Sequence, residues 1–250
     1  MSCSRGPLAI QELPPNAALG AFSVSEDGTR VAYAWKGDIY WVSTDGASAP
    51  FRLTQTRAAE NAPAFSPDGG RLAFTRGGEI FVQDLKTGAV AQLNEASGGA
   101  AGAFQWSPDG ARVLYAASTP GVRTQVLPNY SGRFVTARNF VRTVAGDEPA
   151  PSTLYTVAAG GGKPVKLGEG VGADWSPDGK EVLARVVTQD RKKATYRIYD
   201  AATGKARTLH EYTDERWVAQ SFAMWSPDGK WVAFTKDAGG FIHLHRVAAA

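Results

Sequence analysis

A four-residue turn sequence, Ser-Pro-Asp-Gly, occurs four times in the 250 residues, and a fifth, degenerate copy reads Ser-Glu-Asp-Gly. In such a turn Pro presets φ near about −65°, Asp accepts hydrogen bonds from the backbone, and Gly adopts positive φ without steric cost. Each copy follows a large apolar residue and precedes a short apolar run, which predicts an antiparallel hairpin around each turn. The predicted structural turn residues are Asp27, Gly28, Asp68, Gly69, Asp109, Gly110, Asp178, Gly179, Asp228 and Gly229.

The turns recur with a regular period. Successive turn aspartates are 41, 41, 69 and 50 residues apart. A period of about 40–50 residues with several strands per unit is typical of a β-propeller, whose blades are four-stranded antiparallel sheets. We therefore predict an all-β fold, a single β-propeller domain over 1–250 with five four-stranded antiparallel blades. The blades are expected at about 19–60, 61–102, 103–170 with an insertion at 118–151, 171–220, and 221–250 plus 8–13.

The strands expected in the first module are residues 21–24, 31–35, 39–42 and 51–53. Residues 8–13 form an additional expected strand, and the last module lacks a fourth one. The additional strand can complete the last blade and close a five-bladed ring, which removes two exposed sheet edges. The alternative is an excerpt from a larger propeller whose ends resemble a closure.

Composition excludes several classes of partner. The net charge of +3 is spread along the chain, so neither a nucleic-acid nor a membrane footprint is predicted. Cys3 is the only cysteine, which rules out an intrachain disulfide. Residues 1–20 lack the apolar core of a signal peptide. The compartment therefore stays open: cytoplasmic by default, and periplasmic or secreted if the chain is a fragment.

The sequence offers no set of residues typical of catalysis. A serine hydrolase of the α/β type carries Gly-x-Ser-x-Gly, and the nearest match, Gly46 to Pro50, fails at its last position. The three histidines are His210, His243 and His245. The last two alternate on one expected strand and share a face, but no third metal ligand is evident. We predict no catalytic residues, no metal and no cofactor, and hence no enzymatic activity of this chain alone.

The expected topology separates short turns from long loops. In an up-and-down blade the first and third turns lie on one face of the propeller, and the second loop and the connection between blades lie on the other. The second set contains the insertion 118–151, a charged tip at 190–193 and the connection 211–221. Functional loops on a rigid scaffold commonly gather in this way, so we expect the binding surface on this face.

The insertion combines arginines with aromatic residues, a composition typical of interface hot spots. The alternative is a solvated excursion with a few anchoring aromatics. The tip 190–193 taken alone is interpreted as a solvated hairpin end. The residues predicted to bind a substrate or partner are Arg123, Tyr130, Arg133, Arg138, Arg142, Asp147 and Glu148.

The last module reads Trp-Ser-Pro-Asp-Gly-Lys-Trp-Val-Ala-Phe at 225–234, followed by Ile-His-Leu at 242–244. It resembles a blade of the N-terminal β-propeller in the prolyl oligopeptidase/dipeptidyl peptidase IV family of serine peptidases. The segments 127–130 and 146–149 are similar to segments of its bacterial members, and the repeats also resemble those of TolB. The resemblance covers almost the whole chain. His245 departs from the tyrosine usual in the family, and the hydrolase triad is absent.

The resemblance implies a non-catalytic propeller that gates and positions peptide substrates for a hydrolase domain absent from this chain. The parent protein is then a serine peptidase, and the implied partners are a peptide substrate or a C-terminal α/β-hydrolase domain. In dipeptidyl peptidases a Glu pair in a propeller excursion grips the free amine of the substrate, and here only Asp147-Glu148 is comparable. The alternative is a free-standing TolB-like protein-interaction scaffold. A propeller enzyme such as a polysaccharide lyase is a third hypothesis, which three histidines support poorly.

Overall fold

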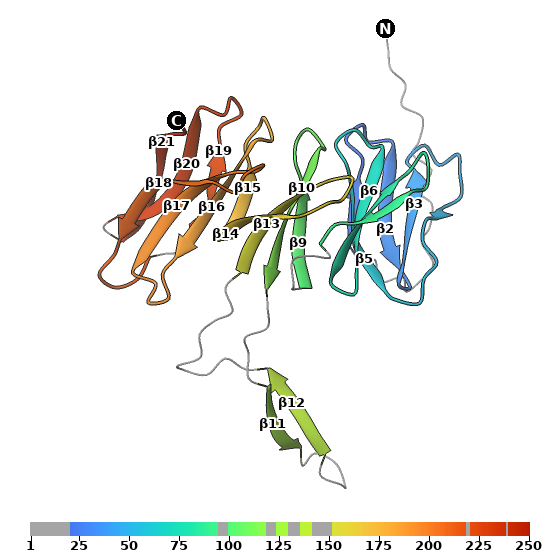
Figure 1. The fold of residues 1–250 in the computed structure, drawn as a ribbon, viewed down its shortest axis with the longest axis horizontal. Coiled ribbons are helices and arrows are strands. Elements are labelled where there is room, and N and C mark those ends of the chain that lie inside the picture. The colour runs from blue at the N-terminus through green and yellow to red at the C-terminus, as the bar shows by residue number, and fades with distance from the viewer. Residues whose placement is uncertain are drawn as a thin grey trace.

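The computed structural model describes residues 21–94, 100–118, 124–129, 136–141, 152–218, 221–238 and 240–250. These residues form antiparallel β-sheets and contain no helix. Five of the sheets stand side by side in a row, and a separate two-stranded hairpin lies below them (Figure 1). The prediction of an all-β propeller built from antiparallel blades is confirmed.

The first four sheets contain four strands each. Sheet one consists of β1 (Phe22–Val24), β2 (Arg30–Trp35), β3 (Asp38–Ser43) and β4 (Phe51–Arg52). Sheet two consists of β5 (Glu60–Phe65), β6 (Arg71–Arg76), β7 (Glu79–Asp84) and β8 (Val90–Gln92). Sheet three consists of β9 (Ala100–Trp106), β10 (Arg112–Ser118), β13 (Ser152–Ala158) and β14 (Val165–Glu169). Sheet four consists of β15 (Val171–Trp175), β16 (Glu181–Val187), β17 (Lys193–Asp200) and β18 (Ala206–Thr213).

Sheet five has three strands in the described residues, β19 (Ala223–Trp225), β20 (Trp231–Ala238) and β21 (Phe241–Ala248). The expected strand at 8–13 lies outside the described residues. Sheets one and five stand at opposite ends of the row (Figure 1), so the described residues form an open arc and do not show the closed ring.

The hydrophobic core lies between successive sheets. The second strand of an inner sheet is apolar on both of its faces, because the sheet packs against a neighbour on either side. In β6, for example, Leu72, Ala73 and Phe74 are each 0% exposed. A large apolar residue at the end of the first strand enters the interface with the preceding sheet. Trp106 does so between sheets two and three, where its indole Nε1 donates a hydrogen bond to the carbonyl of Ala64 at 3.0 Å.

The Ser-Pro-Asp-Gly turns share one hydrogen-bond pattern. In the second turn the Ser66 hydroxyl donates to Asp68 Oδ1 at 2.5 Å, and the Gly69 amide donates to the Ser66 carbonyl at 2.8 Å. Arg30 links neighbouring blades, since its Nη2 donates to the carbonyl of Gly69 at 2.8 Å. Arg71 makes the equivalent bond to Gly110 one blade later. The turns are therefore part of the contact between blades as well as local connections.

Two turn glycines form a matched pair for mutation. Gly69 and Gly229 have φ of 65° and 69°, so a β-branched residue at either is strained by about 1–2 kcal/mol. A Cβ at Gly69 would also lie 2.5 Å from Arg30 Nη2, whereas one at Gly229 meets nothing closer than Pro177 Cδ at 3.8 Å. We expect Gly69→Val to lower the free energy of unfolding more than Gly229→Val does in urea titrations. Equal losses would show that the Arg30 contact adds nothing.

The turn aspartates make the fold sensitive to acid. A hydrogen bond from Ser25, followed by one from the Thr29 amide, lowers the pKa of Asp27 to about 2. Because the pKa of Asp27 is lower in the folded chain than in the unfolded chain, where it is about 3.9, its ionised carboxylate stabilises the fold at pH values above about 3.9. This stabilisation is lost as the pH falls towards 2. We expect Ser25→Ala to raise the Asp27 pKa, measured by NMR titration of its carboxyl carbon, and to reduce the share of stability lost between about pH 4 and 2. An unchanged titration in the variant would contradict this assignment.

The insertion contributes its own hairpin. Strands β11 (Thr124–Asn129) and β12 (Thr136–Val141) pair only with each other among the described strands. The insertion leaves sheet three between β10 and β13, which remain directly paired up to Ser118 and Ser152. The hairpin thus extends from the face opposite the turn between β9 and β10 (Figure 1).

Candidate functional site

The two loops that topology assigns to the insertion's face are bonded to each other. These are the tip at 190–193, between β16 and β17, and the connection that follows β18. The Asp214 amide donates to the Lys192 carbonyl at 2.8 Å, and the Val218 amide donates to the Arg191 carbonyl at 2.6 Å. We call the face that bears the insertion, the tip and this connection the loop face. The opposite face, which bears the Ser-Pro-Asp-Gly turns, is the turn face.

Two adjoining hollows lie where the tip meets the connection, and together we call them the loop groove. The first, of about 660 Å³, is lined by Thr188, Gln189, Asp190, Lys192, Lys193, Thr213, Asp214 and Glu215. The second, of about 370 Å³, is lined by Asp214, Glu215, Arg216, Trp217, Asp237 and Gly240. Because Asp214 and Glu215 line both hollows, this acidic pair forms the middle of the groove.

The connection holds the acidic pair and an aromatic ring in a defined turn. Asp214 Oδ1 accepts hydrogen bonds from the amides of Arg216 at 2.8 Å and Trp217 at 3.2 Å. The Val218 side chain is buried, whereas Trp217 is 66% exposed. One capped turn therefore presents two carboxylates and a solvent-exposed indole next to one another. Such a surface suits a cation attached to an apolar group.

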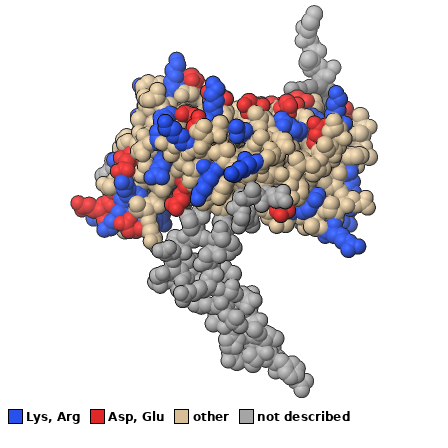
Figure 2. All heavy atoms as spheres, viewed as in Figure 1, with Lys and Arg blue, Asp and Glu red and all other residues tan. Residues whose placement is uncertain are grey.

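The charge of the groove is mixed. A hydrogen bond from the Thr188 hydroxyl, followed by one from the Lys192 amide, holds the pKa of Asp190 below its ordinary value. At the edge of the tip, Lys193 Nζ lies 2.8 Å from Glu211 Oε1 and lowers the pKa of that carboxyl. Both carboxyls are therefore ionised at neutral pH. Basic and acidic side chains are likewise interspersed over the surface that Figure 2 shows.

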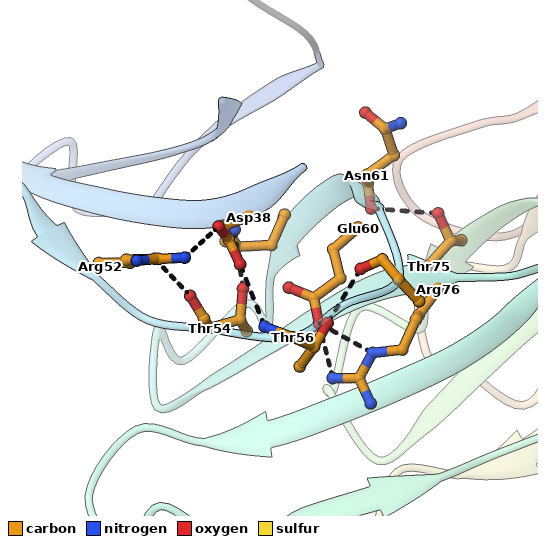
Figure 3. A network of polar contacts seen from close by, with 10 residues as sticks. Asp38, Arg52, Thr54, Thr56, Glu60, Asn61, Thr75 and Arg76 are labelled. Atoms are coloured by element: carbon orange, nitrogen blue, oxygen red, sulfur yellow. Dashed lines mark hydrogen bonds and ion pairs between the residues drawn. The ribbon is translucent and has the colours of Figure 1, made fainter. Parts of the chain in front are cut away.

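A second polar network lies between sheets one and two (Figure 3). Arg76 Nη2 lies 2.6 Å from Glu60 Oε1, which also accepts a hydrogen bond from the Thr56 hydroxyl at 3.0 Å. The Glu60 side chain is 0% exposed. Nearby, Arg52 pairs with Asp38 at 2.6 Å. Since the Glu60 carboxylate is out of reach of solvent, this network braces the connection between the two sheets and is not a ligand site.

The residues predicted from the insertion are not brought together in the described structure. Arg138 lies in β12, with Leu127 as its cross-strand partner. The others, Arg123, Tyr130, Arg133, Arg142, Asp147 and Glu148, lie outside the described residues. Sequence reasoning missed Asp214, Glu215 and Trp217. The signal that could have found them is an acidic pair two residues before a tryptophan, within a connection already assigned to the loop face.

His210 packs between sheets four and five, whereas His243 and His245 lie exposed on β21 of sheet five. His210 contacts the Phe234 ring at a centroid distance of 4.8 Å. Its pKa is lowered by burial, then by the positive charges of Lys236 and His245. Within the described residues no group of three or more His, Cys, Asp or Glu is placed to hold a metal ion. The same residues include no helix long and apolar enough to span a membrane.

The family model of the dipeptidyl peptidase IV (DPP IV) N-terminal region matches residues 47–248. The chain belongs to this family. The match confirms the resemblance found in the last module, and it covers all of sheets two to five. The search of curated proteins finds no match to this DPP IV N-terminal-region chain.

Solved structures share the fold of this DPP IV N-terminal-region chain. A Bacteroides ovatus protein assigned as a dipeptidyl aminopeptidase IV is similar with a TM-score of 0.70 and 18% identity over 88% of this chain and 34% of that one. Porphyromonas gingivalis dipeptidyl peptidase 4 gives a TM-score of 0.73 and 15% identity, covering 91% of this chain and 38% of the peptidase. TolB from Acinetobacter baumannii gives a TM-score of 0.48 and 18% identity, covering 93% of this chain and 52% of TolB. The chain thus spans little more than a third of the two peptidases' length.

Proposed function

We propose that this chain is the propeller of a serine peptidase and that its loop face gates and positions peptide substrates for an α/β-hydrolase domain. Membership of the DPP IV N-terminal-region family supports the peptidase context. The observation that carries the positioning role is the loop groove, which lies on the face where the blades gather their long loops. The propeller itself supplies binding and access, and the hydrolase domain supplies the nucleophile.

The groove matches the chemistry of a peptide's amino end. The carboxylates of Asp214 and Glu215 can accept hydrogen bonds from an ammonium group, and the exposed Trp217 indole can pack against the first side chain. Exposed ion pairs contribute only about 0.2–1 kcal/mol each. The propeller alone is therefore expected to bind peptides weakly, and tight binding requires contacts from a second domain.

The insertion is proposed to act on the same face. Its hairpin β11–β12 extends from sheet three on the side of the loop groove. Arginines with aromatic residues form bidentate contacts to carboxylates and pack against partner surfaces. We therefore assign Arg123, Tyr130, Arg133, Arg138, Arg142, Asp147 and Glu148 to contacts with the peptide or the hydrolase domain.

The acidic pair offers a direct test of peptide binding. Asp214→Asn with Glu215→Gln keeps the capped turn, because an Asn side-chain oxygen also accepts amide hydrogen bonds, but removes both charges. We expect about three- to tenfold weaker binding of the tripeptide Ala-Pro-Ala in NMR titrations, equivalent to about 0.7–1.4 kcal/mol. Binding of its N-acetyl form should not change.

Asp84→Asn is the matched control, because Asp84 caps a turn through the Lys86 and Thr87 amides in the same manner but on the turn face. The control should bind both peptides like the parent chain. Equal losses for the free and acetylated peptides, or a loss in the control, would show that the pair does not recognise the amine.

A further inference from the structure

Arg185 departs from the residue type that the repeat carries at its position. It lies in β16, nine residues after the serine of its turn, and the other four modules carry Ala34, Thr75, Ala116 and Thr235 at that position. Four small side chains therefore satisfy this position in the other blades. Arg185 is nevertheless only 8% exposed. A buried guanidinium is costly unless it is well compensated, and the other four blades fold with a small residue there, so this position is a candidate for a role specific to the fourth blade.

The side chain faces sheet five. Arg185 lies between Val171 and Tyr196 in the cross-strand register of sheet four. Tyr196 on the same face contacts the Phe234 ring of sheet five at a centroid distance of 5.0 Å. Its hydroxyl lies 2.7 Å from Ser221 Oγ, at the entry to β19. Arg185 is thus placed at the interface between the fourth and fifth blades, beside a short chain of hydroxyl groups.

A cavity of about 470 Å³ opens at this interface, and we call it the inter-blade cavity. It is lined by Val171, Gly172, Arg185, Ser221, Phe222 and Ala223. The register of β15 on β16 shifts between Val171 and Asp174, and Gly172 within the shift has a φ of 59°. A Cβ at Gly172 would meet no heavy atom within 4 Å, so the wall is open there. The first strands β15 and β19 contact each other, which places the cavity where the two blades converge.

Arg185 is the charged side chain among the residues that line the cavity, so the lining favours an anion. Charged groups of both signs lie elsewhere in the interface: Lys236 Nζ lies 5.1 Å from the centre of the Tyr212 ring, and Asp174 on β15 lies opposite Leu183. Arginine has five donors in a planar fork that matches the two oxygens of a carboxylate. It can therefore hold a carboxylate with one edge while its remaining donors contact the protein. The Ser221 hydroxyl is a further donor on the cavity wall.

We propose that the inter-blade cavity binds a carboxylate group of a peptide ligand, with Arg185 as the bidentate partner and Ser221 as a second donor. The proposal rests on the proposed peptide-binding function and adds a separate subsite to it. The loop groove recognises an amine, whereas the inter-blade cavity recognises an acid. The carboxylate is either the peptide's C-terminus or an acidic side chain, and the experiment separates these two sources.

The test compares acids with amides on the parent chain and on two variants. Ala-Pro-Ala is titrated as free acid and as C-terminal amide, and Ala-Pro-Glu amide is compared with Ala-Pro-Gln amide. The readout is the NMR signal of the Arg185 Nε–H group, which is identified by its loss in Arg185→Lys. We expect this signal to shift with at least one carboxylate peptide and not with the amide that matches it. Arg185→Gln should weaken that binding by about tenfold or more. Arg185→Lys should weaken it by less, because lysine keeps the positive charge but lacks the two parallel donors of the guanidinium.

Arg197→Gln is the control, since Arg197 lies on the neighbouring strand β17, opposite Ala184. It should leave all four titrations unchanged. The acid–amide comparison on the parent chain stands even if a variant fails to fold. Equal binding of acids and amides, or an Arg185 signal that does not respond to the acid, overturns this inference and leaves the proposed function intact. If none of the peptides binds, both are wrong.

Discussion

Arg76→Ala is expected to lower the free energy of unfolding by about 3–5 kcal/mol, because it leaves a buried carboxylate without its counter-ion. The Glu60 side chain is 0% exposed, and Arg76 contacts it through Nη2 at 2.6 Å and Nε at 2.8 Å. Glu60 Oε2 has no hydrogen-bond partner among the described residues, and the Thr56 hydroxyl that donates to Oε1 carries no charge. The Arg76 guanidinium also lies 4.4 Å from the centre of the Phe81 ring. Urea unfolding measures the loss.

The control for this prediction is Arg207→Ala. Arg207 pairs with Glu181 at 3.1 Å, but the two side chains are 42% and 33% exposed, and such surface pairs contribute about 0–1 kcal/mol. Adding Glu60→Gln to Arg76→Ala should recover part of the stability, because the uncompensated charge is then removed. Equal losses for Arg76→Ala and Arg207→Ala, or no recovery in the double variant, would show that the buried pair does not brace sheets one and two.

Trp106→Ala is expected to cost a similar amount, about 3–5 kcal/mol, because it opens a cavity between sheets two and three. Trp106 is 8% exposed and donates its indole hydrogen bond to Ala64. The substitution also removes the ring under the Arg71 guanidinium, which lies 5.4 Å from the ring centre. The loss appears in urea unfolding or as a lowered melting temperature.

Trp217→Ala is the matched control, since Trp217 is 66% exposed. It should change the free energy of unfolding by less than about 0.5 kcal/mol while weakening peptide binding in the loop groove. A large loss of stability in Trp217→Ala, or a small one in Trp106→Ala, would contradict the assignment of one tryptophan to blade packing and the other to the binding surface.

The blades were predictable because their signals are local. Each turn specifies its own hairpin through residues that are adjacent in sequence. The first module was expected at 21–24, 31–35, 39–42 and 51–53, and its strands run at 22–24, 30–35, 38–43 and 51–52. The end of the array was less predictable, because pairing between the first and last strands depends on the curvature of the row. Curvature accumulates from the packing of each blade on the next, which no single repeat encodes.

The side of the propeller on which the long loops lie was predictable from the sequence, but the residues that meet there were not. The up-and-down order of strands places the tip at 190–193 and the connection after β18 on the same face of the propeller. Two backbone hydrogen bonds join these loops there. The loop groove, however, depends on how Asp214 folds back on Arg216 and Trp217. The Glu60–Arg76 pair joins the first and second strands of one sheet across a register shift in β5. Neither contact follows from composition, whereas the arginines and aromatics of the insertion are visible in the sequence itself.

The central claim is that peptides engage the loop face of this propeller. Hydrogen–deuterium exchange of the full chain, with and without saturating Ala-Pro-Ala, tests it most directly, because both faces are read in one experiment. We expect slower exchange of the amides of 188–193 and 214–218, the two segments that contain most of the residues lining the loop groove. Amides in the turns at 66–69, 107–110, 176–179 and 226–229 should exchange as before. Protection confined to those turns, or no protection on the loop face, would contradict the claim.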